Sequence, residues 1–90
     1  MTYTITFSSK AQKQIEALER SGNQALLRKI VALTSELENH PREGTDKPEI
    51  LKGDLAGYWS RRINREHRLV YSIDDNIVTV TVISAKGHYE

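Results

Sequence analysis

The chain has 90 residues and a formal net charge of +1, and 38% of its residues are hydrophobic. This length supports a single hydrophobic core, so we expect one domain over residues 1–90. The absence of cysteine excludes a disulfide framework, a thiolate zinc site and a cysteine nucleophile. The longest apolar run, Ile30 to Leu33, is far shorter than the ~20 residues that span a bilayer. No signal peptide is visible, and we expect a soluble cytoplasmic protein.

The first half of the chain predicts one strand and two helices. Residues 2–7 alternate between threonine and apolar side chains, which is typical of a strand with one buried face. A helix is expected from a serine cap at residues 8–9 to Gly22, and a second from the cap Asn23 to residues 39–41. Their apolar stripes are Ala11, Ile15 and Leu18, then Leu26, Ile30, Leu33 and Leu37. The short connection predicts an antiparallel helical hairpin.

The second half predicts three further strands after a loop over residues 40–48. Residues 58–63 and 67–73 form two strands joined by a hairpin-length loop, and the β-branched run 77–83 forms the last strand. A short extended piece over residues 49–52 and a turn over residues 53–57 precede them. The order β-α-α-β-β-β predicts an α+β fold, in which a mainly antiparallel sheet carries the helical hairpin on one face.

The charge distribution singles out the segment from Tyr58 to Tyr71. The whole chain has 13 basic and 12 acidic residues, too balanced a charge for a protein that holds nucleic acid by charge alone. This segment, however, contains four arginines and one acid, Glu66. The arginines are Arg61, Arg62, Arg65 and Arg68. They are either a solvated strand surface or a basic face for a phosphate-bearing substrate, and the sequence leaves the strand register that decides between them open.

Common catalytic templates are missing from the sequence, which has no Gly-rich phosphate loop, His-x-x-x-His pair or Gly-x-Ser-x-Gly elbow. His40, His67 and His88 are far apart, so we expect no metal site and no cofactor. The pair His88-Tyr89 follows the strongest strand and is either a frayed tail or held near the sheet edge. RNA cleavage without a metal needs a base, an acid and cations, which Glu, His and Arg supply.

Four segments of the C-terminal half carry a family resemblance. They are Lys47–Lys52 (KPEILK), Leu55–Ile63 (LAGYWSRRI), Glu66–Tyr71 (EHRLVY) and the closing His88-Tyr89. In this order they resemble the YoeB/Txe family of toxins from bacterial type II toxin–antitoxin modules, within the RelE-like superfamily. That superfamily's fold agrees with the β-α-α-β-β-β order predicted from the residue patterns.

The resemblance implies a metal-independent endoribonuclease that cleaves mRNA on the translating ribosome through attack by the 2′-hydroxyl. The family's catalytic positions match Glu49 as general base, Arg68 as transition-state cation and the terminal pair His88 and Tyr89, with His88 as general acid. Basic positions of the family's groove match Lys52 and Arg62, and we expect Arg65 to bind RNA beside them.

The implied partners are a cognate YefM/Axe-like antitoxin of the Phd type, the ribosome with its mRNA, and a second copy of the chain in a homodimer, with no membrane partner. The sequence leaves two alternatives open. One is a catalytically silent RelE-like module that binds an antitoxin or RNA. The other is an interaction domain whose arginines are only surface residues.

Overall fold

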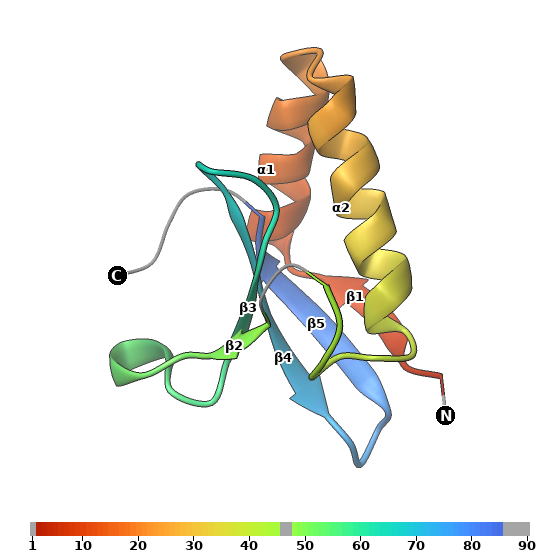
Figure 1. Ribbon diagram of the computed structural model, residues 1–90, viewed down its shortest axis with the longest axis vertical. Helices are drawn as coiled ribbons and strands as arrows, with labels where there is room; N and C mark the ends of the chain where they lie inside the picture. The colour runs from red at the N-terminus through yellow and green to blue at the C-terminus, as the bar shows by residue number, and fades with distance from the viewer. Residues whose placement is uncertain (1, 46–47, 86–90) are drawn as a thin grey trace.

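The computed structural model describes residues 2–45 and 48–85. Figure 1 shows two helices beside a twisted sheet. In chain order the elements are β1 (Thr4–Phe7), α1 (Ser9–Arg20), α2 (Gln24–Leu37), β2 (Glu49–Ile50), the short 3-10 helix η1 (Gly53–Leu55), β3 (Trp59–Arg62), β4 (Arg68–Asp74) and β5 (Thr79–Ser84). The predicted α+β class and element order are confirmed.

The five strands form one mixed sheet with the order β1-β5-β4-β3-β2. β2, β3, β4 and β5 pair antiparallel, whereas β1 runs parallel to β5, with Ile5 opposite Val80. A parallel pair cannot be closed by a tight turn, and here the rest of the domain connects its two strands. The first strand thus pairs with the last one, a contact that no pattern among neighbouring residues predicts.

Both helices begin at the predicted caps. The Ser8 hydroxyl accepts from Ala11 N, and the Asn23 side chain accepts from Leu26 N, each at 3.1 Å. These bonds satisfy amide groups that the first turn of a helix leaves unpaired. The chain reverses at Gly22, whose φ of +78° is readily adopted only by a residue without a Cβ.

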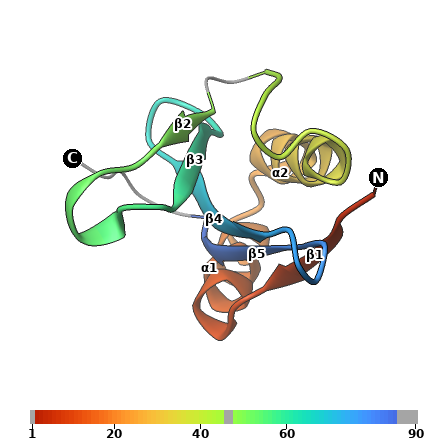
Figure 2. The same ribbon diagram turned by 90° about the horizontal axis from the view of Figure 1, so that it is seen from below.

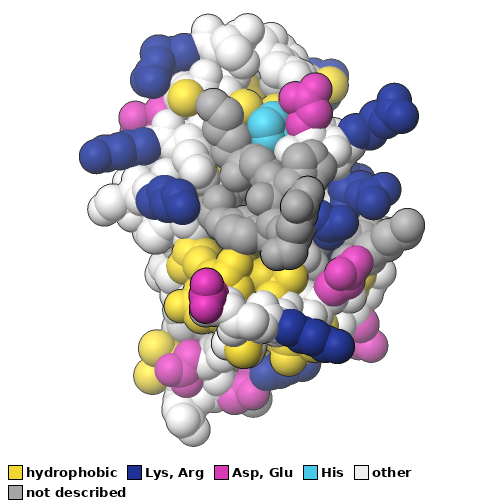
Figure 3. All heavy atoms as spheres, turned by 90° about the vertical axis from the view of Figure 1, so that its left-hand side faces the viewer, with side chains coloured by type: hydrophobic (Ala, Val, Ile, Leu, Met, Phe, Trp, Pro, Cys, Tyr) yellow, Lys and Arg dark blue, Asp and Glu magenta, His cyan; other side chains and the backbone are white. Residues whose placement is uncertain are grey.

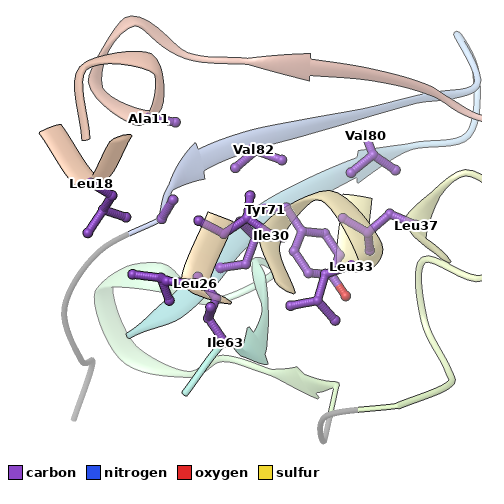
Figure 4. Packing of buried hydrophobic residues seen from close by; sticks show 12 residues of the cluster. Ala11, Leu18, Leu26, Ile30, Leu33, Leu37, Ile63, Tyr71, Val80 and Val82 are labelled. Carbon is purple, nitrogen blue, oxygen red and sulfur yellow. The ribbon is translucent and has the colours of Figure 1, made fainter. Parts of the chain in front are cut away.

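The core is one cluster between the helices and the sheet. Figure 2 shows α2 alongside β4 and β5, and Figure 4 shows Leu33 and Leu37 of α2 beside the ring of Tyr71. α1 joins the cluster near the end of β5, where Ala85 N donates to the side chain of Gln14. The most completely buried members are Ala11, Leu33, Leu37, Leu69, Tyr71, Val80, Val82 and Ala85. The predicted helical stripes all contribute to this cluster.

The boundaries differ from the prediction in the second half. The extended piece before the turn contains a strand of only two residues, β2, and η1 lies within the expected turn. β5 begins at Thr79 because the turn before it is longer than predicted. In that turn the Asp74 carboxylate accepts from the amides of Asn76 and Ile77, and Val78 has a φ of +48°. Among the described residues, no helix has the length and apolar composition needed to cross a membrane.

Candidate active face on strands β2, β3 and β4

The strand register brings Glu49 and Arg68 onto the same face of the sheet. Glu49 lies opposite Ser60 on β3, and Ser60 lies opposite Val70 on β4. Two residues along the strands, Arg62 lies opposite Arg68. Residues that pair across antiparallel strands share a face, and so do alternate residues on one strand. Glu49 and Arg68 are therefore separated by two strand spacings, about 10 Å across the sheet, and by two residues, about 7 Å along the strands.

The other face of the same strands belongs to the core. Tyr71 and Leu69 on β4 lie opposite Trp59 and Arg61 on β3, and all four point toward the helices. The alternation of the strands thus separates the face that packs on the helices from a second face. This second face, which we call the active face, is made of Glu49, Ser60, Arg62, Arg68 and Val70, of which Ser60 and Val70 are fully buried.

Arg68 is the half-buried member of the active face. Its Nη1 lies 3.5 Å from the hydroxyl of Ser60, which is fully buried. The contact is long for a hydrogen bond, yet it directs the guanidinium toward the strand that carries Glu49's partner. Glu49, in contrast, is exposed at the edge strand β2, so its carboxylate is open to solvent and to a ligand.

The remaining cationic residues predicted for RNA binding surround the active face. Arg62 is exposed at the end of β3, and Arg65 is exposed in the loop to β4. The Asn64 side chain accepts from the amides of Glu66 and His67 and shapes that loop. With Lys52 after β2 and Arg68 on β4, four basic residues lie on or next to these three strands, although Glu66 adds a negative charge to the loop.

An open groove of about 1040 Å³ adjoins the active face, on the side of β2 and η1. Its walls come from the start of α1, the segment around η1 and the end of β5. The lining residues are Ser8, Lys10, Leu51, Lys52, Gly53, Asp54, Leu55 and Ile83. Figure 3 views this side of the molecule and shows a patch of hydrophobic side chains with both basic and acidic side chains around it. Only Lys52 of this groove was predicted, because no periodic pattern links α1 to η1.

Two of the predicted catalytic residues, His88 and Tyr89, lie outside the described residues. Within the described part of the chain, no three His, Asp or Glu side chains are close enough together to hold a metal ion.

Arg61 does not belong to the basic face, which corrects the interpretation of the arginine-rich segment as one surface. Its side chain is fully buried, and Nη1 donates to Glu36 Oε1 at 2.8 Å. The guanidinium carbon also lies 6.0 Å from the centre of the Tyr71 ring. The signal for this was present, because Arg61 shares its strand parity with Trp59 and Ile63, both apolar.

Solved structures of bacterial toxins have the same architecture. The YoeB/ParE toxin from Agrobacterium tumefaciens matches with a TM-score of 0.89 at 36% identity, covering 96% of this chain and 99% of that one. The YoeB-YefM complex from Staphylococcus aureus matches at 0.81 and 42% identity, covering 99% and 100% of the two chains. The YoeB dimer from the same organism matches at 0.84 and 40% identity, with the same coverage. These matches define the class of the protein as a YoeB/RelE-like toxin.

Sequence comparison narrows the class to a family. The model of the YoeB-like toxin of bacterial type II toxin-antitoxin systems matches residues 7–89. Toxin YoeB from Synechocystis is 45% identical over 71 residues, covering 79% of this chain and 80% of the relative. Toxin YoeB from Streptomyces coelicolor is 41% identical over 86 residues, covering 94% and 98%. The chain belongs to the YoeB family of type II toxins.

Proposed function

We propose that this toxin is an endoribonuclease that cleaves mRNA on the translating ribosome and so inhibits translation. The observation that carries the proposal is the shared face of Glu49 and Arg68, which pairs an exposed carboxylate with a half-buried cation. A carboxylate can accept the 2′-hydroxyl proton, and a guanidinium can stabilise the charge that develops on phosphorus. Family membership supports the same activity.

In the proposed mechanism Glu49 removes the proton from the 2′-hydroxyl, whose oxygen then attacks the neighbouring phosphorus. Arg68 offers two N–H donors to the phosphate oxygens as negative charge builds there. His88 protonates the departing 5′-oxygen, which leaves a 5′-hydroxyl and a 2′,3′-cyclic phosphate that can open to a 3′ phosphate. Tyr89 stacks on a base or orients the scissile phosphate. No step in this scheme requires a metal or cofactor.

The basic residues supply RNA contacts. Lys52 lies in the groove beside β2, and Arg62 and Arg65 are exposed next to Arg68. Each phosphate contact contributes to affinity, but three or four contacts bind RNA weakly at physiological salt. The ribosome supplies the missing affinity in this proposal, since it presents the mRNA at a fixed position.

The proposed protein partners follow from the relatives. A YefM-like antitoxin is the expected inhibitor, because the similar Staphylococcus aureus toxin is seen in a YoeB-YefM complex. A second copy of the chain is a further partner, as that toxin also forms a YoeB dimer. An acidic or amphipathic antitoxin segment that folds over the active face would pair with its arginines.

The test is cleavage of an end-labelled mRNA by the purified chain, on naked RNA with EDTA and on programmed ribosomes with magnesium. We expect cuts on ribosomes only, with 5′-hydroxyl ends, and losses of at least a hundredfold in Glu49→Ala, Arg68→Ala and His88→Ala. Full cleavage by all three variants would refute the assignment of roles. No cleavage by the folded wild-type chain on either substrate would favour the catalytically silent binding module.

A further inference from the structure

A polar cluster around the buried Arg61 holds the loop that leads from α2 to the active face. Arg61 is its centre: besides the bond to Glu36, its Nη2 donates to the backbone carbonyls of His40 and Glu43, at 2.9 and 3.0 Å. Its Nε has no hydrogen-bond partner among the described residues. Burial of an arginine costs free energy unless its N–H groups have hydrogen-bond acceptors. The loop carbonyls are acceptors of this kind and so help to stabilise the buried Arg61.

The Glu36 carboxylate extends the cluster to the end of the described loop. Oε1 accepts from the Thr45 amide and Oε2 from the Thr45 hydroxyl, both at 2.7 Å. A side chain at Gly44 would overlap the same carboxylate, and Gly44 has a φ of +118°. We call the group Arg61, Glu36 and Thr45 the loop anchor.

A second set of contacts fixes the start of the same loop. The Tyr71 hydroxyl donates to the Pro41 carbonyl at 2.7 Å inside the core. Arg42 pairs with Asp75 on the turn between β4 and β5 at 2.8 Å. The described loop is thus tied down at nearly every residue, although it contains no helix or strand. A loop held by so many contacts is typical of a segment that positions a functional residue.

The element that follows the loop has little to hold it by itself. β2 has two residues, both exposed, and lies at the edge of the sheet. Among the described residues it pairs with Ser60 and Trp59, and Leu51 N adds one bond to the Tyr58 carbonyl at 2.7 Å. A two-residue exposed strand buries too little apolar surface to define the position of Glu49 to the fraction of an ångström that catalysis needs.

We infer that the loop anchor positions Glu49 for proton abstraction, so that Arg61, Glu36 and Thr45 are positioning residues of the active face. Thr45 precedes Glu49 by four residues, and Arg61 directly follows Ser60, the strand partner of Glu49. The anchor is therefore connected to Glu49 along the covalent chain and, through Ser60, across the sheet. The inference rests on the proposed function, because it assigns the anchor to the same general base.

The test is a double-mutant cycle between Thr45→Val and Glu49→Gln, measured as single-turnover cleavage on programmed ribosomes. Thr45 is exposed, so the valine variant loses one hydroxyl bond with little loss of packing. We expect Thr45→Val to lower the maximal rate about tenfold, because small misplacements of a catalytic group carry rate losses of up to about a hundredfold. The toxin concentration at half-maximal rate should stay unchanged, since Lys52 and Arg62 are untouched.

In the Glu49→Gln background the same threonine change should alter the rate less than twofold, because the group being positioned no longer acts as a base. Thr45→Ser keeps the hydroxyl and should restore the wild-type rate. Thr34→Val is the matched control, since the bond that Thr34 Oγ1 makes among the described residues lies within α2, to the Ile30 carbonyl. It should cleave at the wild-type rate.

The outcomes separate the two proposals. If Glu49→Gln cleaves at the full rate, the assignment of Glu49 as base is refuted and the positioning role is refuted with it. If Glu49→Gln is impaired but Thr45→Val cleaves normally, only the positioning role is refuted. Equal losses from Thr45→Val in both backgrounds would also overturn it, because they would indicate a general structural effect.

Discussion

Removing Glu36 should destabilise the protein strongly, because it leaves the buried guanidinium of Arg61 without its carboxylate. Breaking a buried ion pair by deleting one partner costs about 3–5 kcal/mol. The Glu36 side chain is 23% exposed and that of Arg61 is 0% exposed. Water can therefore enter part of the space that the carboxylate leaves and partly solvate the guanidinium. We therefore expect Glu36→Ala to lower the free energy of unfolding by about 3 kcal/mol, the lower end of that range.

For a domain of this size, each kcal/mol corresponds to about 4–8 °C in Tm, so the expected drop is roughly 12–24 °C. Urea and thermal unfolding followed by circular dichroism measure both quantities on the purified chain. Glu16→Ala is the control, since Glu16 is an exposed glutamate on α1, and its change should stay within about 0.5 kcal/mol. A loss below about 1 kcal/mol for Glu36→Ala would refute the claim that the pair is buried and essential.

Three further outcomes follow from the core and from two titrating groups. Leu33→Ala, at a leucine with 1% exposure, should cost about 2–5 kcal/mol in urea unfolding. Burial raises the pKa of Tyr71, so the folded state keeps that proton longer; wild-type stability should fall above pH 10 more steeply than that of Tyr71→Phe. Hydrogen bonds from Tyr3 and Arg42 lower the pKa of Asp75, so its contribution is present above pH 3.8 and lost below it. The difference in free energy of unfolding between wild type and Asp75→Asn should therefore shrink as the pH falls below 3.8, as measured by thermal melts at a series of pH values.

Several parts of the fold could be predicted because their causes lie within a few residues. The caps at Ser8 and Asn23 and the stripe from Leu26 to Leu37 depend on contacts between near neighbours, and the structure contains each of them. The length of the turn before β5 was missed because the Asp74 side chain extends it, a polar effect that the apolar alternation does not report.

For the candidate site, the residue types were predictable but their grouping was not. Glu49, Arg62 and Arg68 were selected by motif and charge, whereas their shared face depends on the register of three strands. The same register sends Arg61 inward, although it sits between residues of the outward set. A shift of one residue would exchange the two faces, and nothing in the motif itself excludes that shift.

By itself, the sequence determined the local elements of this toxin, since capping, helical period and strand alternation act over a few residues. Its motifs also select the groups that we propose abstract a proton and bind a phosphate. Only the tertiary structure decided which of them meet: the parallel pairing of β1 with β5, the side of β3 that faces the helices, and the burial of Arg61 against Glu36. These contacts join residues far apart in the chain, and their free energy comes from burial shared by the whole core.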